Sequence, residues 1–267
     1  MASQVRRRLF LALICGLAGP ACAADAENLV IARAGNLPIL LVAPHGGREA
    51  VPGVPVRGSG VTSTDARTTE LALALAKRLK DVLGAEPYVV AARFSRKYID
   101  ANRAEAEAFE SPEAKPAYEA YHNRIRAFVS EIRRRFPRGG LLLDIHGQSD
   151  DPGTVSRGTQ NGATVAALLR QRGETALVGP QSVFGVLQGK GYTVFPPNTP
   201  VGSPREFRKL NGGYTVRTYG SGTPDGIDAI QVEVGRDLRT DPKFIDALAQ
   251  AVVVFHKAYL AEGEQAR

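Results

Sequence analysis

Two histidines directly follow apolar segments of the chain. His45 comes after LLVAP and His146 after LLLDI, and each is followed by glycine. In open α/β sheets, the carboxyl ends of the strands border the crevice where ligands bind, so we expect the two imidazoles to lie close together. Neutral imidazole is a favoured zinc ligand. The pair therefore predicts a zinc site, with two unrelated polar strand ends as the alternative.

A carboxylate lies two residues before the second of these histidines. Asp144 interrupts an apolar strand, and the alternation of side chains places it on the same face as His146. An ionised carboxylate inside a sheet is costly unless it is paired or near a metal. We expect Asp144 to orient a metal-bound histidine or to contact the metal itself. A salt bridge to an arginine is the alternative.

Glu233 is the candidate general base. In AIQVEVG, the apolar residues Ile230, Val232 and Val234 alternate with Gln231 and Glu233. The two polar side chains thus point to the other face, where a carboxylate could reach an attacking water. A strand with one solvated face explains the same alternation.

A catalytic zinc typically takes three protein ligands and leaves one position open. Two carboxylates could be the third ligand: Glu49, which is close to His45 in sequence, and Asp65, which opens a predicted helix. An aspartate at the start of a helix is also explained as an N-cap. The residues alone leave the choice open.

Cationic and amide side chains gather in two further segments. RFSRKYIDANR contains Arg96, Asn102 and Arg103, and GGYTVRTYG contains Tyr214 and Arg217. Guanidinium groups bind carboxylates bidentately, so these segments are candidates for holding an acidic substrate. Solvated surface cations are the competing explanation.

The remaining two histidines lie within helical patterns. His122 is flanked by tyrosines and His256 by apolar residues. Both are interpreted as histidines at the rim of the core.

The elements that must position these residues follow from the periodicity of apolar side chains. Helices covering both faces of a sheet are expected, in a three-layer α/β/α architecture. The first two strands are expected to form a hairpin or to be neighbours. The expected strands are 28–33, 38–43, 87–92, 140–145 and 227–234; the expected helices are 65–83, 116–136 and 242–260; residues 150–160 and 196–225 are expected to be loops over the site.

The N-terminal segment has the order of a secretory signal peptide. Arg6 to Arg8 precede an apolar run from Leu9 to Leu17, and small residues end at Ala23. Residues 1–23 are therefore interpreted as a signal peptide and 24–267 as a single catalytic domain, exported to the periplasm or secreted. A lipoprotein anchor is the alternative, because Cys15 and Cys22 lie in this segment.

Charge and cysteine content narrow the function classes. The formal net charge is +7, and removal of three signal-peptide arginines leaves +4. The chain has no basic run interleaved with aromatic residues, so we do not expect it to bind nucleic acid. A cleft that attracts carboxylates fits the modest net positive charge. Both cysteines leave with the signal, so we expect no disulfide or thiolate chemistry, and no membrane association of the mature chain.

Six motifs in order resemble the N-formylglutamate amidohydrolase family, which is similar in fold to zinc carboxypeptidases. The likeness spans about residues 38–260 and implies a mixed, mostly parallel sheet. Its motifs are PHGG (44–47), TDARTTELA (64–72), RKYIDANR (96–103), LLDIHG (142–147), GGYTVRTYG (212–220) and IQVEVG (230–235).

This resemblance implies a zinc ion bound by His45, His146 and a carboxylate between them in sequence. In the related carboxypeptidases that acid is a Glu three residues after the first His, where this chain has Arg48. The family's pattern favours Asp65, which opens the helix after PHGG, and leaves Glu49 as the second choice.

The resemblance also implies substrate-side roles. Glu233 matches the general base of the carboxypeptidase-like enzymes, and Asn102 and Arg103 match an Asn-Arg pair that holds a substrate carboxylate. Arg217 or Arg157, with Tyr214, would lie near the same substrate, and a guanidinium such as that of Arg103 could steady an oxyanion.

The expected function is zinc-dependent hydrolysis of an amide bond in a small acidic N-acyl amino acid or a glutamyl-type substrate. Export makes cell-wall peptides and poly-γ-glutamate plausible targets. A zinc carboxypeptidase or esterase acting on a larger polymer, and a non-catalytic periplasmic binding protein, are the alternatives. A serine hydrolase is disfavoured because no Gly-x-Ser-x-Gly occurs. The sequence does not indicate an oligomeric state.

Overall fold

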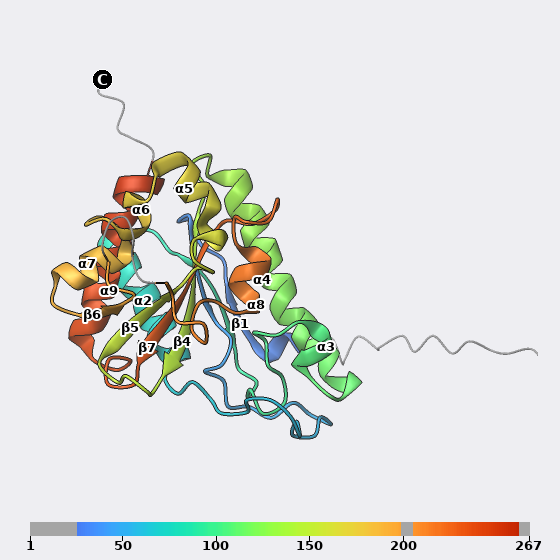
Figure 1. Cartoon of the computed structure of the whole chain (residues 1–267). Helices are drawn as coiled ribbons and strands as arrows, with labels where there is room; N and C mark the ends of the chain where they lie inside the picture. Colours follow the sequence, from blue (N-terminus) through green and yellow to red (C-terminus); the bar gives the residue numbers. More distant parts are fainter. Residues whose placement is uncertain (1–25, 199–204, 262–267) are drawn as a thin grey trace, which may run out of the picture.

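A mixed sheet runs through the molecule (Figure 1), as seen in a computed structural model that describes residues 26–198 and 205–261. Within these residues, seven strands have the order β1-β3-β2-β4-β7-β5-β6. The four central strands β3, β2, β4 and β7 are parallel, β1 and β5 run antiparallel to their inner neighbours, and β6 is parallel to β5. The strands are β1 (Val30–Arg33), β2 (Ile39–Ala43), β3 (Tyr88–Ala92), β4 (Leu141–Gln148), β5 (Thr154–Gly158), β6 (Thr193–Phe195) and β7 (Asp228–Gly235).

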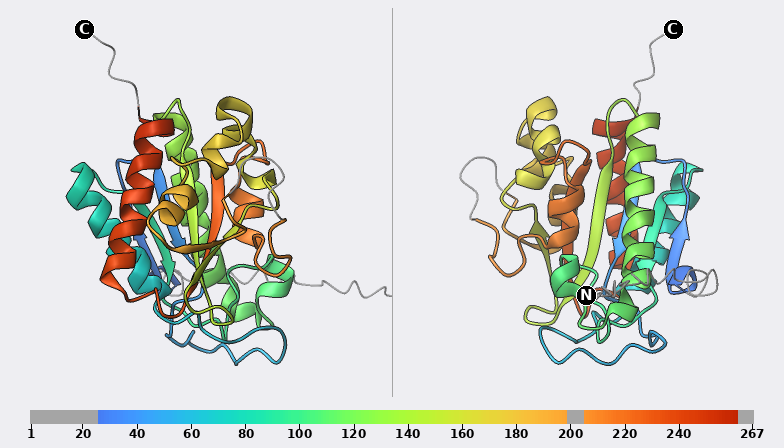
Figure 2. Two further views of the ribbon diagram at one scale, coloured as in Figure 1. Left: turned by 60° about the vertical axis from the view of Figure 1, so that its left-hand side comes forward. Right: turned by 90° about the vertical axis from the view of Figure 1, so that its right-hand side faces the viewer.

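Helices cover both faces of the sheet (Figure 2), which makes the molecule a three-layer α/β/α structure. One apolar core lies between the sheet and α2, α7 and α9, and a second lies between the sheet and α4. The helices are α2 (Thr68–Leu83), α3 (Glu105–Ala108), α4 (Lys115–Arg135), α5 (Ala166–Arg172), α6 (Thr175–Val178), α7 (Val183–Gly189), α8 (Tyr214–Tyr219) and α9 (Pro242–Phe255), with short turns η1 (Pro112–Ala114), η2 (Ala163–Val165) and η3 (His256–Leu260).

Alternation along the central strands assigns side chains to these two cores. In β4, Leu141 and Leu143 belong to the core under α2 and α9, whereas Leu142 belongs to the core under α4. Because successive side chains of a strand point to opposite faces, Asp144 and His146 share the face of Leu142. The sheet therefore carries apolar side chains at its centre and polar ones toward the carboxyl end of the same face.

The carboxyl ends of β2 and β4 lie at the same edge of the sheet because the two strands are parallel. The loop from β2 to α2 lies at this edge, at the bottom of Figure 1, next to the arrowhead of β4. Long irregular connections at the carboxyl edge are where parallel sheets bind ligands.

The structure confirms the expected α/β class and the three-layer arrangement with a mostly parallel sheet. The hairpin or neighbour interpretation of the first two strands is wrong, because β3 lies between β1 and β2 and pairs with both. The two segments expected to be loops contain β5 and α8. The position of β3 between β1 and β2 is decided by pairing between strands that are distant in sequence. Local apolar periodicity carries no information about such pairing.

The predicted signal peptide, residues 1–23, lies outside the described residues. Among the helices that the structure describes, none has both the length and the apolar character required to cross a bilayer.

Candidate metal centre and cleft

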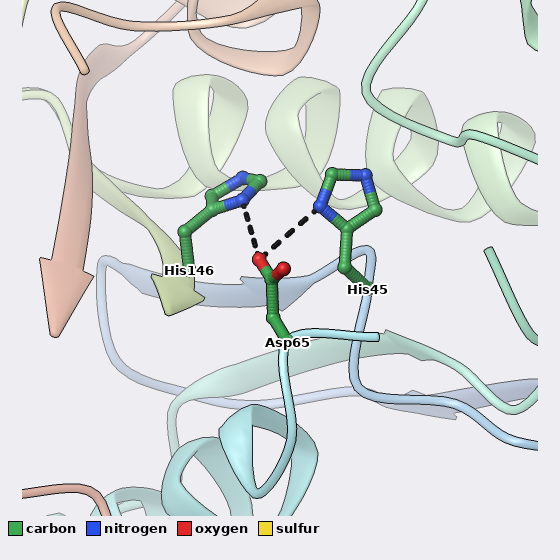
Figure 3. A group of neighbouring side chains, drawn as sticks. All are labelled: His45, Asp65 and His146. Atoms are coloured by element: carbon green, nitrogen blue, oxygen red, sulfur yellow. Dashed lines mark hydrogen bonds and ion pairs between the residues drawn. The ribbon is translucent and has the colours of Figure 1, made fainter. Parts of the chain in front are cut away.

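Three ligand-type side chains converge at the carboxyl edge of the sheet. His45 lies two residues after the end of β2, His146 lies in β4, and Asp65 comes from the loop that leads into α2. Figure 3 shows both rings turned toward the Asp65 carboxylate, whose Oδ2 lies 3.3 Å from Nδ1 of His45 and 3.2 Å from Nδ1 of His146. The ligand atoms all lie within 4.8 Å of one another, close enough to share one ion.

Both imidazoles are held from behind by carboxylates. Nε2 of His45 lies 2.7 Å from Oδ1 of Asp100, and Nε2 of His146 lies 3.1 Å from Oδ2 of Asp144. An ionised carboxylate only accepts hydrogen bonds, so each Nε2 carries the proton and donates it. In this tautomer each Nδ1 presents a lone pair at the point where Asp65 also presents its carboxylate, so a cation bound there would be shared by all three groups. This is the usual arrangement behind a metal-bound histidine.

The buried Asp65 carboxylate faces these two ring nitrogens. Burial works against ionisation, but hydrogen bonds with His146 and His45 lower the pKa of Asp65 well below its ordinary value. Burial likewise opposes protonation of His146, yet the nearby Asp144 and Asp65 carboxylates raise the pKa of His146 well above its usual range. All of these groups favour positive charge at their meeting point. The two imidazoles and one carboxylate therefore form a group that could hold a metal ion.

Local structure explains how Asp65 reaches the centre. Its backbone N–H donates to the His45 carbonyl at 3.1 Å, and its own carbonyl accepts from the N–H and hydroxyl of Thr68. The residue directly before α2 is Arg67, in a left-handed conformation, so the N-cap interpretation of Asp65 is wrong. The Asp65 side chain does not cap α2, and it accepts a hydrogen bond from the Gly147 N–H at 3.2 Å.

Glu49, the other candidate ligand, lies away from this centre. Its carboxylate is 54% exposed and approaches Arg93 at 3.8 Å. Asp65 is thus the carboxylate that the fold brings to the two histidines.

Glu233 lies beside His146 on the same face of the sheet. The two residues are register partners in the β4–β7 ladder, and Glu233 is 7% exposed. The Gln231 side-chain amide donates to Oε1 of Glu233 at 2.8 Å, and its oxygen accepts from the Gly213 N–H at 2.7 Å. Burial raises the pKa of Glu233 above its ordinary value. Such a carboxylate is suited to taking up and releasing a proton.

Arg239 joins the segments that carry these side chains. Its buried guanidinium donates to the carbonyls of Val234 at 2.9 Å, Ala66 at 3.0 Å and Gln148 at a short distance. Each carbonyl belongs to a residue one or two positions from Glu233, Asp65 or His146. Gly147 makes room for this group, because a Cβ there would lie 2.4 Å from the guanidinium carbon.

The centre opens into a cleft of about 910 Å³. Asn102, Arg103 and Arg217 line it, as expected from the sequence. Asn102 is fixed, since its oxygen accepts from the Thr215 N–H at 2.8 Å and its nitrogen donates to Oε1 of Gln231 at 3.4 Å. Arg103 forms no ion pair with any carboxylate in the described part of the chain.

Two residues expected to contact substrate lie elsewhere. Arg157 is buried, and its guanidinium donates to Glu206 at 3.4 Å and to Asn198 at 3.2 Å, outside the cleft lining. Tyr214 is likewise absent from that lining and packs edge-on against the ring of His122 at 5.6 Å. The expectation for Arg157 is wrong, because its buried guanidinium is engaged by Glu206 and Asn198, whereas Tyr214 lies outside the cleft lining against His122.

The other two histidines are not part of the centre. His122 is more deeply buried than a rim position, its Nδ1 lies 2.8 Å from the Tyr219 hydroxyl, and burial lowers its pKa to about 3. His256 is half-buried at the end of α9.

Sequence reasoning missed Asp100 and Arg239 as residues that organise the site. Asp100 is 1% exposed and accepts a hydrogen bond from Nε2–H of His45 at 2.7 Å. It also accepts two from the Arg96 guanidinium, at 2.9 and 3.0 Å. Its position inside the motif RKYIDANR, two residues before Asn102, could have identified Asp100 as a residue of the site.

Comparison with known proteins places this geometry in a recognised fold. The sequence matches no protein-family model and no curated protein. Among solved structures, a gene product of Agrobacterium tumefaciens is similar over 88% of this chain and 96% of its own, with a TM-score of 0.58 and 17% identity. The N-formylglutamate amidohydrolase of Ralstonia eutropha JMP134 is similar over 86% of this chain and 96% of its own, with a TM-score of 0.53 and 16% identity.

The similarity to these two proteins is one of fold. The chain has the architecture that the N-formylglutamate amidohydrolase also has, as the six motifs implied.

Replacing Asp100 by Asn is expected to weaken zinc binding by about 10- to 100-fold, because an uncharged amide no longer fixes the protonated Nε2 of His45. Competition with a chromogenic chelator measures the affinity. Asp81→Asn, at an exposed carboxylate near the end of α2, is the control and should leave zinc affinity unchanged. Equal affinities in the two variants would contradict the role given to Asp100.

Proposed function

We propose that this protein is a zinc-dependent hydrolase that cleaves the amide bond of an acidic N-acyl amino acid or glutamyl-type substrate. The observation that carries the proposal is the convergence of His45, Asp65 and His146 on one point, next to the buried carboxylate of Glu233. The fold shared with an N-formylglutamate amidohydrolase supports the same reaction class.

His45, Asp65 and His146 would hold the metal, and Asp100 and Asp144 would keep the two rings in the binding tautomer. A bound zinc ion acidifies water and polarises a carbonyl oxygen. Three protein ligands would leave a position open for water or substrate.

Glu233 is the residue we assign to proton transfer. Its carboxylate accepts a proton from the attacking water and returns it to the nitrogen of the leaving amine. Burial raises the pKa of this carboxyl, and the Gln231 amide at 2.8 Å fixes one of its oxygens. The other oxygen is then available for the transferred proton.

Arg103 and Arg217 are the residues we assign to recognition of a substrate carboxylate. Both line the cleft. Among the residues that the structure describes, neither forms an ion pair with a carboxylate. A guanidinium binds a carboxylate through two parallel hydrogen bonds and orients it. Arg103 would also be available to steady the oxyanion during hydrolysis.

The mature protein is expected to contain one zinc ion per chain and to hydrolyse N-formyl-L-glutamate or an N-acylglutamate faster than neutral acyl amino acids. Elemental analysis and amine release measure the two properties, with His146→Ala as the metal-free control. Preference for the C-terminal bond of long peptides would identify a carboxypeptidase instead. Substoichiometric zinc together with indifference to chelator and absence of hydrolysis would identify a binding protein.

Glu233→Gln should lower kcat by about 100- to 10,000-fold, because the amide cannot accept the proton of water. Zinc content and thermal stability should stay unchanged, which separates loss of proton transfer from loss of the centre. Glu174→Gln, at an exposed position, is the matched control. A Glu233→Gln variant that retains normal turnover would exclude this base.

We also propose export of the protein. The order of arginines, apolar run and small residues in positions 1–23 supports a cleaved signal peptide. Intact-mass measurement of the protein from its native host should give a chain that begins at residue 24. A mature chain that retains residues 1–23 would overturn the proposal.

A further inference from the structure

A segment we call the strap, residues 206–213, forms one wall of the cleft. Its first residue, Glu206, has a side chain only 3% exposed. That carboxylate accepts from the backbone N–H groups of Thr159 at 2.8 Å and Asn161 at 2.9 Å, and from Arg157 at 3.4 Å. A buried carboxylate with this many donors is a firm anchor, because removing it would leave buried donors without partners.

The other end of the strap is anchored independently. The Asn211 carbonyl accepts from the Gln160 N–H at 2.7 Å, and the Gly213 N–H donates to Gln231 at 2.7 Å. The strap also packs directly on the end of β5, where a Cβ at Gly158 would lie 2.4 Å from the Leu210 carbonyl oxygen. Both ends are therefore fixed to the sheet that carries the metal centre.

Two cations lie between these anchors. Arg208 and Lys209 are exposed and line the cleft. Neither forms an ion pair within the portion of the chain that the structure describes. The buried contacts of Arg157 and Glu206 thus hold two positively charged side chains over the cleft.

These cations add to those already assigned. Arg103 and Arg217 line the same cleft, whereas Arg96, the fifth cation in its lining, is engaged by Asp100 at 2.9 Å. The acidic residues in the lining are Asp65, Asp150 and Glu233, of which Asp65 and Glu233 belong to the centre. Four cations are more than one substrate carboxylate requires.

The size of the cleft points the same way. Pockets for small ligands span about 300–1,000 Å³. At about 910 Å³, this cleft is near the upper end of that range and exceeds what one N-acyl amino acid would fill.

From these observations we propose that Arg208 and Lys209 form a second anion-binding subsite, which takes a carboxylate one or more units away from the amide that is cleaved. The preferred substrate is then an acidic oligomer with at least two carboxylates, the glutamyl-type member of the proposed class, whereas a single acyl amino acid fills only the nearer subsite. This proposal rests on the proposed hydrolase function, whose Arg103 and Arg217 bind the nearer carboxylate.

Binding to the zinc-loaded Glu233→Gln protein, measured by isothermal titration calorimetry, tests the subsite without hydrolysis. The probes are N-acetyl-L-glutamate and the N-acetylated γ-linked trimer of glutamate. Adding Arg208→Gln and Lys209→Gln should weaken trimer binding by about 10-fold, the effect of losing hydrogen bonds between charged groups. Affinity for N-acetyl-L-glutamate should change by less than about twofold.

The matched control adds Lys190→Gln and Lys257→Gln, which remove the same charge at exposed positions outside the cleft lining. It should leave both affinities unchanged. Three results would overturn the second subsite. They are an equal loss of affinity for both probes in the strap variant, a loss of trimer affinity in the control equal to that in the strap variant, and no loss of trimer affinity in the strap variant. None of these results bears on hydrolysis, which the metal and amine-release measurements decide separately.

Discussion

The structure depends on a concentration of buried charge at one edge of the sheet. Asp65 is buried at the floor of the cleft, where the two imidazoles lower its pKa, and it faces two ring nitrogens whose opposite sides are held by Asp100 and Asp144. Isolated carboxylates in such surroundings are strongly unfavourable. Three of them can be buried together only if positive charge is placed among them, as the Arg96 guanidinium beside Asp100 and Asp65, and as protons on the rings or a divalent ion.

The sheet makes this concentration of charge possible. β2 and β4 are parallel neighbours, so His45 and His146 emerge at the same edge although about a hundred residues separate them. β7 adds Glu233 in register with His146. The opposite face of the same strands is packed with apolar side chains against α2 and α9. The face under α4 carries a second apolar core at its centre and the polar groups toward its carboxyl end.

The sequence was sufficient to predict the parts of the site that depend on a single strand. Apolar alternation identified Asp144, His146 and Glu233, because strand period and strand end are local properties. It could not choose between Glu49 and Asp65, since an aspartate before a helix satisfies the rules for a cap as well as those for a ligand. The structure distinguishes the two explanations, because Arg67 directly precedes α2 and the Asp65 carboxylate faces both imidazoles.

Features that depend on contacts between distant segments could not be predicted. The insertion of β3 between β1 and β2, the contact of Asp100 with His45 and the contact of Arg157 with Glu206 each join segments far apart in the chain. Arg157 illustrates the difficulty, because an arginine has the same residue type whether it binds substrate or anchors a strap. Its burial, which the sequence does not reveal, decides between them.

The close packing of Gly147 on Arg239 couples two positions that are 92 residues apart in sequence. Any side chain added at position 147 would occupy the space of the guanidinium, and a shorter residue at position 239 would leave carbonyls of three segments without their shared donor. The two positions are therefore free to vary only together. A glycine that follows a histidine in the strand is thus dictated by an arginine beyond the end of β7.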